Sequence, residues 1–258
     1  MGFETIQFEV LEAGIGVMSL NRPRVYNSVN LKMMQELEEL LEDASQKSEV
    51  NVLILKGNGD KGFCAGLDIK EAAKLADSWD ARSFYMFQKR LARLVLKLRL
   101  IPQPVICLVH GAAVGLGFSF VLASDIKIAS SDARFCAAFI NIGLGGADMA
   151  CSYLLPKMIG AGRASELLLT GEFISAQESY ALGMLSKVVE REKLWDSGVQ
   201  MARLLNSKNP LGLALTKEAI NMNLDAPSLE HALQLEDRNQ AFLFLRSKAG
   251  EQKSSRYF

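Results

Sequence analysis

The stretch Pro104–Phe120, PVICLVHGAAVGLGFSF, indicates the class of fold most clearly. It begins with an uninterrupted apolar run, passes through glycines and continues into a second apolar segment. Runs without alternation are typical of strands buried on both faces of a parallel sheet. An equivalent pattern comes earlier, where NVLILKG (51–57) is followed by GDKGFCAGLDIKEAAK (59–74). Both stretches predict a buried strand that ends in a glycine-rich turn and leads into a helix.

The rest of the chain extends this alternation. Further strands are expected at 5–12, 15–20 and 126–130, and helices at 31–47, 80–101, 115–125 and 163–173. Strands that alternate with helices indicate an α/β fold. After about residue 195 the sequence becomes mostly helical, with too few strands to join a sheet. We therefore predict an α/β core over residues 1–195 and a C-terminal helical region over 196–258, packed on its own core or on a neighbouring subunit.

Composition restricts the classes of function. The chain has 258 residues, of which 49% are hydrophobic, and its formal net charge is zero. This balance argues against a broad surface for nucleic acid or an anionic membrane. The four cysteines lack metal-ligand spacing and have apolar neighbours, which predicts free thiols in a reducing compartment. The N-terminal segment has no signal-peptide pattern and no apolar run long enough for a span. We expect a cytoplasmic protein.

The two glycine turns could form a site together. Backbone N–H groups at a helix N-terminus have no intrahelical partner. Two such turns side by side could therefore direct two N–H groups at one carbonyl oxygen, as an oxyanion hole does. The alternative is that both are ordinary tight turns in which glycine permits positive φ. Neither turn is a phosphate-binding loop, because no Gly-Lys-Ser/Thr follows.

Several motifs occur in an order that resembles a known family. They are NRPRVYNSVN (21–30), FCAGLDIKE (63–71), PVICLVHGAAVGLG (104–117), SDIKIASSDARF (124–135) and LLPKMIGAGRASELLLTGEFISAQES (154–179). With them the chain resembles the crotonase superfamily, also called the enoyl-CoA hydratase/isomerase family. The resemblance implies a spiral of repeated ββα units with a C-terminal helical oligomerisation region. It also implies acyl-CoA thioester substrates and a homotrimer or a dimer of trimers.

The resemblance also suggests site residues. By motif, the N–H groups of Leu67 and Leu116 would hold the thioester oxygen. The neighbouring backbone at Ala65, Gly66 and Gly115 would contact the substrate. Two cations near these motifs, Arg24 and Lys70, are candidate partners for the CoA phosphates; the alternative for both is solvated surface. No metal or redox cofactor is implied, because coenzyme A is part of the substrate.

The chain departs from the hydratase pattern at both catalytic glutamates. Ser119 is at the first glutamate position and Phe139 at the second, where both would contact substrate. Hydration needs a water that is oriented and deprotonated and a second proton delivered to the neighbouring carbon. Neither a serine without a base nor a phenylalanine supplies these transfers. A standard hydratase assignment would therefore rest on the fold alone.

Asp148, in INIGLGGADMACSY (140–153), is the leading candidate for the missing acid. Dienoyl-CoA isomerases, a hydroxyacyl-CoA thioester hydrolase and an aryl-CoA dehalogenase in this superfamily carry an aspartate in a similar segment. It could act as a general acid or base, or as a nucleophile; the alternative is a helix N-cap. Dehalogenation is disfavoured, because Ala92 and Phe139 replace its His and Trp. Three hypotheses remain: an enzyme of the hydratase/isomerase type, a thioester hydrolase and a non-catalytic acyl-CoA-binding or partner-binding protein.

Overall fold

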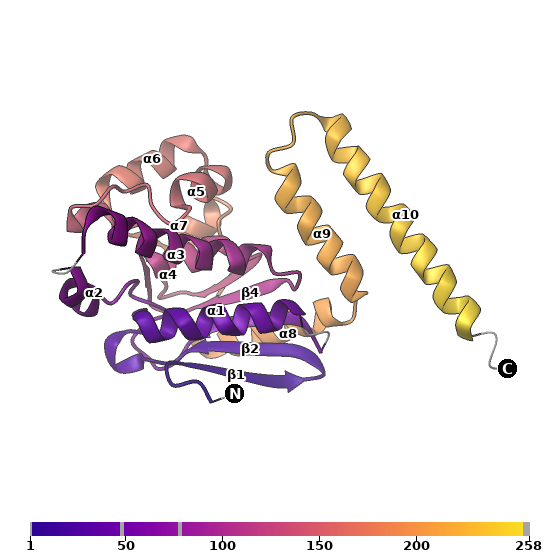
Figure 1. Cartoon of the computed structure of the whole chain (residues 1–258), viewed down its shortest axis with the longest axis horizontal. Helices are drawn as coiled ribbons and strands as arrows, with labels where there is room; N and C mark the ends of the chain where they lie inside the picture. The colour runs from indigo at the N-terminus through magenta and orange to yellow at the C-terminus, as the bar shows by residue number, and fades with distance from the viewer. Residues whose placement is uncertain (1, 47–48, 77–78, 255–258) are drawn as a thin grey trace.

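The computed structural model describes residues 2–46, 49–76 and 79–254 (Figure 1). Its centre is a six-stranded sheet in which β1 and β2 are antiparallel and all other neighbours are parallel. In spatial order the strands are β1 (Ile6–Glu12), β2 (Gly14–Leu20), β3 (Val50–Gly57), β4 (Val105–Val109), β6 (Ile126–Ser130) and β9 (Lys187–Val189). The predicted strands at 51–57, 126–130 and within 104–110 are therefore confirmed.

Helices cover both faces of this sheet. One face packs against α1 (Leu31–Gln46), α3 (Ala81–Leu100) and α4 (Leu116–Ala123), and the other against α8 (Leu194–Asn206). In β3, Leu53 and Leu55 join the first hydrophobic layer, whereas Val52 and Ile54 join the second. Burial on both faces explains why the strand sequences show no polar alternation.

A second, three-stranded sheet consists of β5 (Ala112–Val114), β7 (Arg134–Cys136) and β8 (Ile174–Ser175). Strands β4 and β5 are followed by α4, and β6 and β7 are followed by α5 (Cys151–Ile159), which gives repeated ββα units. The remaining elements are η1 (Pro23–Val25), α2 (Ile69–Ala76), η2 (Ile140–Ile142), α6 (Ala161–Thr170), α7 (Ala176–Ala181) and η3 (Arg191–Lys193).

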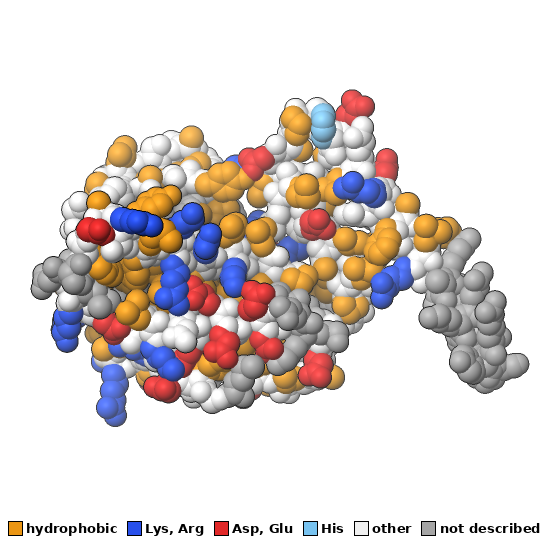
Figure 2. Space-filling view, in the orientation of Figure 1, with side chains coloured by type: hydrophobic (Ala, Val, Ile, Leu, Met, Phe, Trp, Pro, Cys, Tyr) orange, Lys and Arg blue, Asp and Glu red, His pale blue; other side chains and the backbone are white. Residues whose placement is uncertain are grey.

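The C-terminal helices α9 (Pro210–Asn223) and α10 (Leu229–Ser254) lie side by side and extend away from the sheet (Figure 1). Apolar side chains are exposed along both, including those of Ile220, Met222, Leu229, Leu233 and Leu245 (Figure 2). Helix α8 differs from them, because it packs on the sheet although all but its first two residues fall in the predicted region 196–258. The division after residue 195 stays a prediction, and the last four residues of that region lie outside the described part.

Two buried contacts attach α9 to the body. The Lys217 ammonium lies 2.8 Å from an Asp125 carboxylate oxygen and donates to the Gln103 carbonyl at 2.9 Å. Asp125 also accepts a hydrogen bond from the Val105 N–H at 2.8 Å. Across the described residues, no helix has the length and apolar composition needed to cross a bilayer.

Candidate active site

The two glycine turns lie next to each other in equivalent register. Cys64 forms an isolated parallel bridge with Ala113, and the Val114 N–H donates to the Cys64 carbonyl at 2.9 Å. Leu67 follows Cys64 by three residues, and Leu116 follows Ala113 by three residues. Because the bridge is parallel, the two leucines occupy equivalent positions on adjacent turns.

A glycine with positive φ precedes each leucine. Gly66 has φ 89° and Gly115 has φ 53°. A Cβ atom at Gly66 would lie 2.8 Å from the Val114 carbonyl oxygen and 3.4 Å from the Leu116 nitrogen, so only glycine allows this approach. Leu116 is the first residue of α4, where an N–H has no intrahelical partner. Among the described residues, neither leucine N–H donates a hydrogen bond.

A cavity of about 100 Å³ opens beside these turns. Its wall is almost entirely apolar, and among the described lining residues Asp148 is the only ionisable one and Gln88 the only other polar side chain. The lining residues are Ala65, Gly66, Leu67, Ile69, Gln88, Leu91, Val114, Gly115, Leu116, Ala138, Phe139, Ile142, Leu144, Asp148 and Met149. The structure therefore brings the predicted residues Leu67, Leu116 and Asp148 to one cavity.

Two hydrogen bonds hold the Asp148 carboxylate, which is half-buried. One oxygen accepts from the Met149 N–H at 2.8 Å, and the other accepts from the Gln88 side-chain amide at 3.1 Å. Helix α5 begins after Ala150, where no side-chain cap bond is present. The carboxylate therefore does not cap α5 and faces the cavity with lone pairs still available.

Gln88 was missed by sequence reasoning. It lies on α3, three residues before Leu91 and seven before Val95, which places it on the same side of the helix as these buried residues. A single polar residue on such a face is the signal that could have identified it. Its amide donates only to Asp148 among the described residues, so it orients the acid.

The loop that carries Asp148 has an unusual backbone. Met149 has φ 46° and Ala150 has φ 67°, a left-handed conformation that non-glycine residues adopt at an energetic cost. Gly146 packs directly against the Leu168 carbonyl of α6, where a Cβ atom would not fit. Strained backbone held by its surroundings is common at functional sites.

The two positions that replace glutamates differ in their placement. Phe139 lines the cavity, with its ring 3.6 Å from the position of a Cβ on Gly115. Ser119 is fully buried and does not reach the wall, because its hydroxyl lies 3.3 Å from the Gly115 carbonyl and 3.4 Å from the Cys151 sulfur. Burial raises the pKa of the Cys151 thiol to about 12, so this sulfur is not a thiolate at neutral pH.

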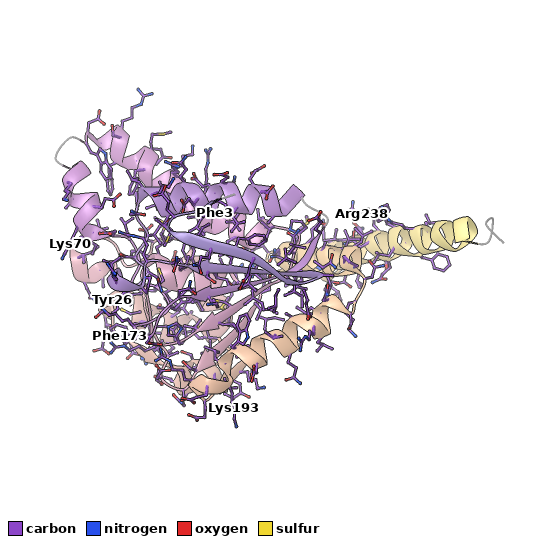
Figure 3. All side chains as sticks on the ribbon, turned by 90° about the horizontal axis from the view of Figure 1, so that it is seen from below. Phe3, Tyr26, Lys70, Phe173, Lys193 and Arg238 are labelled. Atoms are coloured by element: carbon purple, nitrogen blue, oxygen red, sulfur yellow. The ribbon has the colours of Figure 1, made fainter. Side chains whose placement is uncertain are left out.

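The predicted phosphate partners lie outside the cavity. Arg24 and Lys70 are both exposed, and neither lines it. Ala65 connects the cavity to this surface, because its N–H donates to the Tyr26 carbonyl at 2.9 Å. Tyr26 and Lys70 lie at the same end of the molecule (Figure 3). Arg24 precedes Tyr26 by two residues, and Lys70 directly follows the lining residue Ile69.

Asp68 has a structural role at the same end. Its carboxylate pairs with Arg22 at 2.9 Å and accepts from the Glu71 N–H at 3.3 Å at the start of α2. Burial alone would raise the pKa of Asp68, but these hydrogen bonds and the Arg22 charge outweigh it and lower the pKa. The Asp68 carboxylate is therefore occupied by its bonds to Arg22 and to the first turn of α2.

Known proteins resemble this chain over nearly its whole length. Residues 11–257 match the family model described as enoyl-CoA hydratase/isomerase. A protein named "Probable enoyl-CoA hydratase echA12" from Mycobacterium bovis is 39% identical over 90% of this chain and 82% of its own. The 1,2-epoxyphenylacetyl-CoA isomerase of Escherichia coli is 37% identical over 88% of this chain and 85% of its own.

Solved structures agree with the sequence relatives. The crystal structure of an enoyl-CoA hydratase from Bacillus anthracis has a TM-score of 0.88 at 29% identity and covers 97% of both chains. This match confirms the predicted α/β crotonase fold with a helical C-terminal region, whereas the role of that region in oligomerisation stays a prediction. The chain belongs to the enoyl-CoA hydratase/isomerase family of the crotonase superfamily.

Proposed function

We propose that this enzyme isomerises a double bond in an acyl-CoA thioester, with Asp148 as the group that moves the proton. The observation that carries the proposal is the composition of the cavity wall. Asp148 is the one ionisable side chain among the described lining residues, and it lies in the same cavity as the Leu67 and Leu116 turns. One carboxylate suffices to take a proton from one carbon and return it to another.

The reaction is then a proton transfer within the acyl chain. The N–H groups of Leu67 and Leu116 hold the thioester oxygen and stabilise the charge that develops on it. The Asp148 carboxylate removes a proton from carbon 2 of a 3-enoyl thioester, which leaves a dienolate with its charge on that oxygen. The resulting carboxylic acid returns the proton to carbon 4, and the product is the 2-enoyl thioester. No water, metal or redox cofactor takes part.

The replaced glutamates support isomerisation over hydration. In this proposal Ser119 and Phe139 occupy the positions of the two hydratase carboxylates. Ser119 is not among the residues that line the cavity, and its hydroxyl bonds to the Gly115 carbonyl, whereas the ring of Phe139 forms part of the wall. The relative from Escherichia coli is named as an isomerase of an acyl-CoA, 1,2-epoxyphenylacetyl-CoA. An apolar wall with one acid suits an apolar acyl group, and no second ionisable side chain lies among the described lining residues.

Substrate binding would extend from the cavity to the exposed cations. The pantetheine would pass Ala65, Gly66 and Gly115, and the CoA phosphates would contact Arg24 and Lys70. Both cations are solvated, so each contact contributes modestly and depends on ionic strength. Coenzyme A enters as part of the substrate.

We propose a homotrimer or a dimer of trimers as the working assembly. The exposed apolar residues of α9 and α10 support this, because patches of that kind mark interaction surfaces. Light scattering should give three or six times the chain mass of 28.3 kDa. A cytoplasmic location is supported by the four buried cysteines, all of which are free.

An acyl-CoA panel tests the reaction. Wild type and Asp148→Asn are compared for 3-enoyl and dienoyl isomerisation, for hydration of 2-enoyl thioesters and for release of free thiol. Isomerisation that disappears in Asp148→Asn, with CoA-ester affinity retained, supports the proposal. Thiol release that disappears in the variant would identify a hydrolase instead. Tight binding without turnover on any thioester would identify a binding protein.

A further inference from the structure

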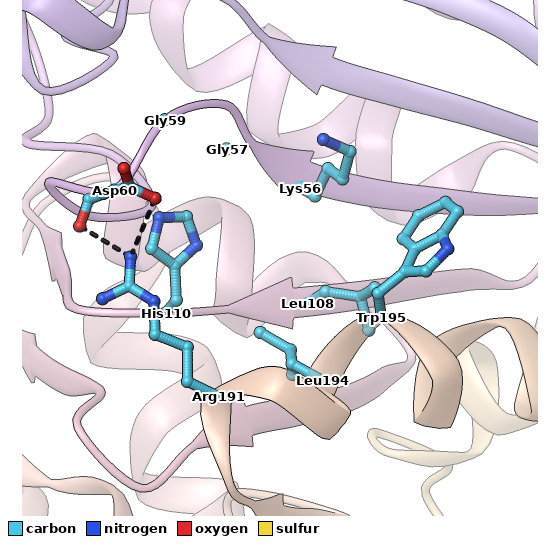
Figure 4. A pocket seen from close by; sticks show the side chains of 9 residues that line it. All are labelled: Lys56, Gly57, Gly59, Asp60, Leu108, His110, Arg191, Leu194 and Trp195. Carbon is cyan, nitrogen blue, oxygen red and sulfur yellow. Dashed lines mark hydrogen bonds and ion pairs between the residues drawn. The ribbon is translucent and has the colours of Figure 1, made fainter.

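A second cavity lies on the opposite side of β3 and β4 from the Asp148 cavity. It has a volume of about 160 Å³ and shares no lining residue with the Asp148 cavity. It forms where β3 and β4 end and η3 leads into α8 (Figure 4). Ligands of open α/β sheets commonly bind outside the carboxyl ends of the strands. The volume exceeds the roughly 10–15 Å³ that one water molecule requires, so the cavity has room for a small ion.

His110 supplies a buried polar atom without a partner. Its side chain lines the cavity, the residue is only 7% exposed, and its Nε2 atom makes no hydrogen bond to any described residue. Leaving a buried polar group unpaired costs about 1–3 kcal/mol, so such groups are rare. Burial first, and then the Arg191 charge, lower the pKa of His110. In the tautomer that carries its proton on Nε2, this N–H has no acceptor among the described residues, and an oxygen of a ligand would supply one.

The charges around the cavity favour an anion. Lys56 is half-buried, and this burial lowers the pKa of its ammonium. The ammonium donates one hydrogen bond to the Asn58 side chain at 2.5 Å, which leaves further N–H donors for a ligand. Arg191 is held by the Asp60 carbonyl at 2.6 Å and by Asp132 at 3.2 Å. The Asp60 carboxylate is fully exposed to solvent. Arg191 is thus paired with the Asp132 and Asp60 carboxylates, at 3.2 and 3.8 Å, and Lys56 is the lining cation whose ammonium can still donate to a ligand.

The opposite wall is aromatic. Trp195, in the first turn of α8, lines the cavity across from the loop that carries Gly59 and Asp60 (Figure 4). The N–H groups of Gly59 and Asp60 donate to no acceptor among the described residues. Free backbone N–H groups and a cation near one site are typical of oxyanion binding.

We propose that this cavity binds a small oxyanion, a carboxylate or a phosphate group, between the Lys56 ammonium and the His110 imidazole. The anion would accept hydrogen bonds from both and would offset the cost of burying them. The inference does not depend on the proposed isomerase activity.

The chain offers its own reporters for a test. It has two tryptophans and two histidines, so Trp79→Phe leaves Trp195 as the only indole, and labelled histidine gives one signal each for His110 and His231. The full-length protein is titrated with inorganic phosphate and, separately, with acetate, at ionic strength held constant with chloride. Lys56→Met removes the proposed donor, and the exposed Lys193→Met is the matched charge control.

We expect a saturable change in Trp195 emission and a shift of the His110 signal while that of His231 stays fixed. Lys56→Met should weaken binding at least about tenfold, because a hydrogen bond to a charged group is lost, and Lys193→Met should not. A response to phosphate alone, acetate alone or both supports the site and identifies the oxyanion. No saturable response to either anion, or the same response in Lys56→Met, would overturn the proposal.

Discussion

Lys127 gives a prediction that depends only on the fold. It lies on β6 and is only 6% exposed, and its ammonium forms no ion pair with the described residues. Burial, followed by the nearby Arg99 charge, lowers its pKa from 10.5 to about 8, and Asp125 only partly opposes this. The folded state therefore binds this proton less tightly than the unfolded chain does.

The difference between 10.5 and about 8 corresponds to about 3 kcal/mol of stability. Between these two pH values the unfolded state binds more protons, so the free energy of unfolding rises with pH. The cost is fully present below about pH 8 and disappears as the pH approaches 10.5. Lys127→Met removes the charge, and should therefore stabilise the protein by about 3 kcal/mol at pH 7 and by about 1 kcal/mol at pH 10.

Urea unfolding at fixed protomer concentration measures this gain, because assembly makes stability concentration-dependent. Lys187→Met is the control, since Lys187 is exposed on the neighbouring strand β9. It should change stability by less than about 0.5 kcal/mol at either pH. A Lys127→Met protein no more stable than wild type at pH 7, or a gain that is equal at pH 7 and pH 10, would refute the reasoning.

Three further predictions concern the active site. Gly146→Ala should destabilise the protein by about 1–3 kcal/mol, because the added methyl group would overpack against the Leu168 carbonyl. Gly145→Ala is the control, since nothing lies within 4 Å of its Cβ position, and thermal unfolding should show a loss of stability in the first variant only. Leu116→Pro removes one N–H at a helix position that tolerates proline and should lower kcat about 100-fold relative to Leu116→Ala; equal rates would exclude that donor. Gln88→Met should lower kcat about tenfold with KM unchanged, because the orienting hydrogen bond to Asp148 is lost; a rise in KM alone would indicate a packing role.

Local patterns were sufficient to predict the core of the fold. Apolar runs marked the buried strands, and glycines marked the turns that follow them, because both signals depend on burial or φ at single positions. A glycine also ends α6, because the C-cap Gly171 has φ 65°, so this helix ends at Thr170 and not at the end of the expected range 163–173. The position of Asp148 beside the turns of Leu67 and Leu116 followed from the order of motifs.

Long-range contacts could not be predicted in the same way. The Gln88–Asp148 hydrogen bond joins residues 60 positions apart, and no local pattern encodes such a pair. Ser119 was expected to contact substrate, but its hydroxyl lies 3.4 Å from the Cys151 sulfur. Tertiary packing, and not the local sequence, sets the direction of this side chain. Helix α8 was grouped with the C-terminal helices, although its apolar side covers the sheet. An amphipathic helix shows that it has a partner without showing which one.

Transfer of deuterium from carbon 2 to carbon 4 of a 3-enoyl-CoA thioester tests the central claim most directly. NMR of the product made in H₂O from a substrate deuterated at carbon 2 follows where the label goes, and Asp148→Asn is the comparison. The proposal predicts deuterium at carbon 4 of the product in wild type, and loss of transfer and of isomerisation in Asp148→Asn while the thioester still binds. Transfer that continues at the wild-type rate in Asp148→Asn would contradict it, because another group would then move the proton.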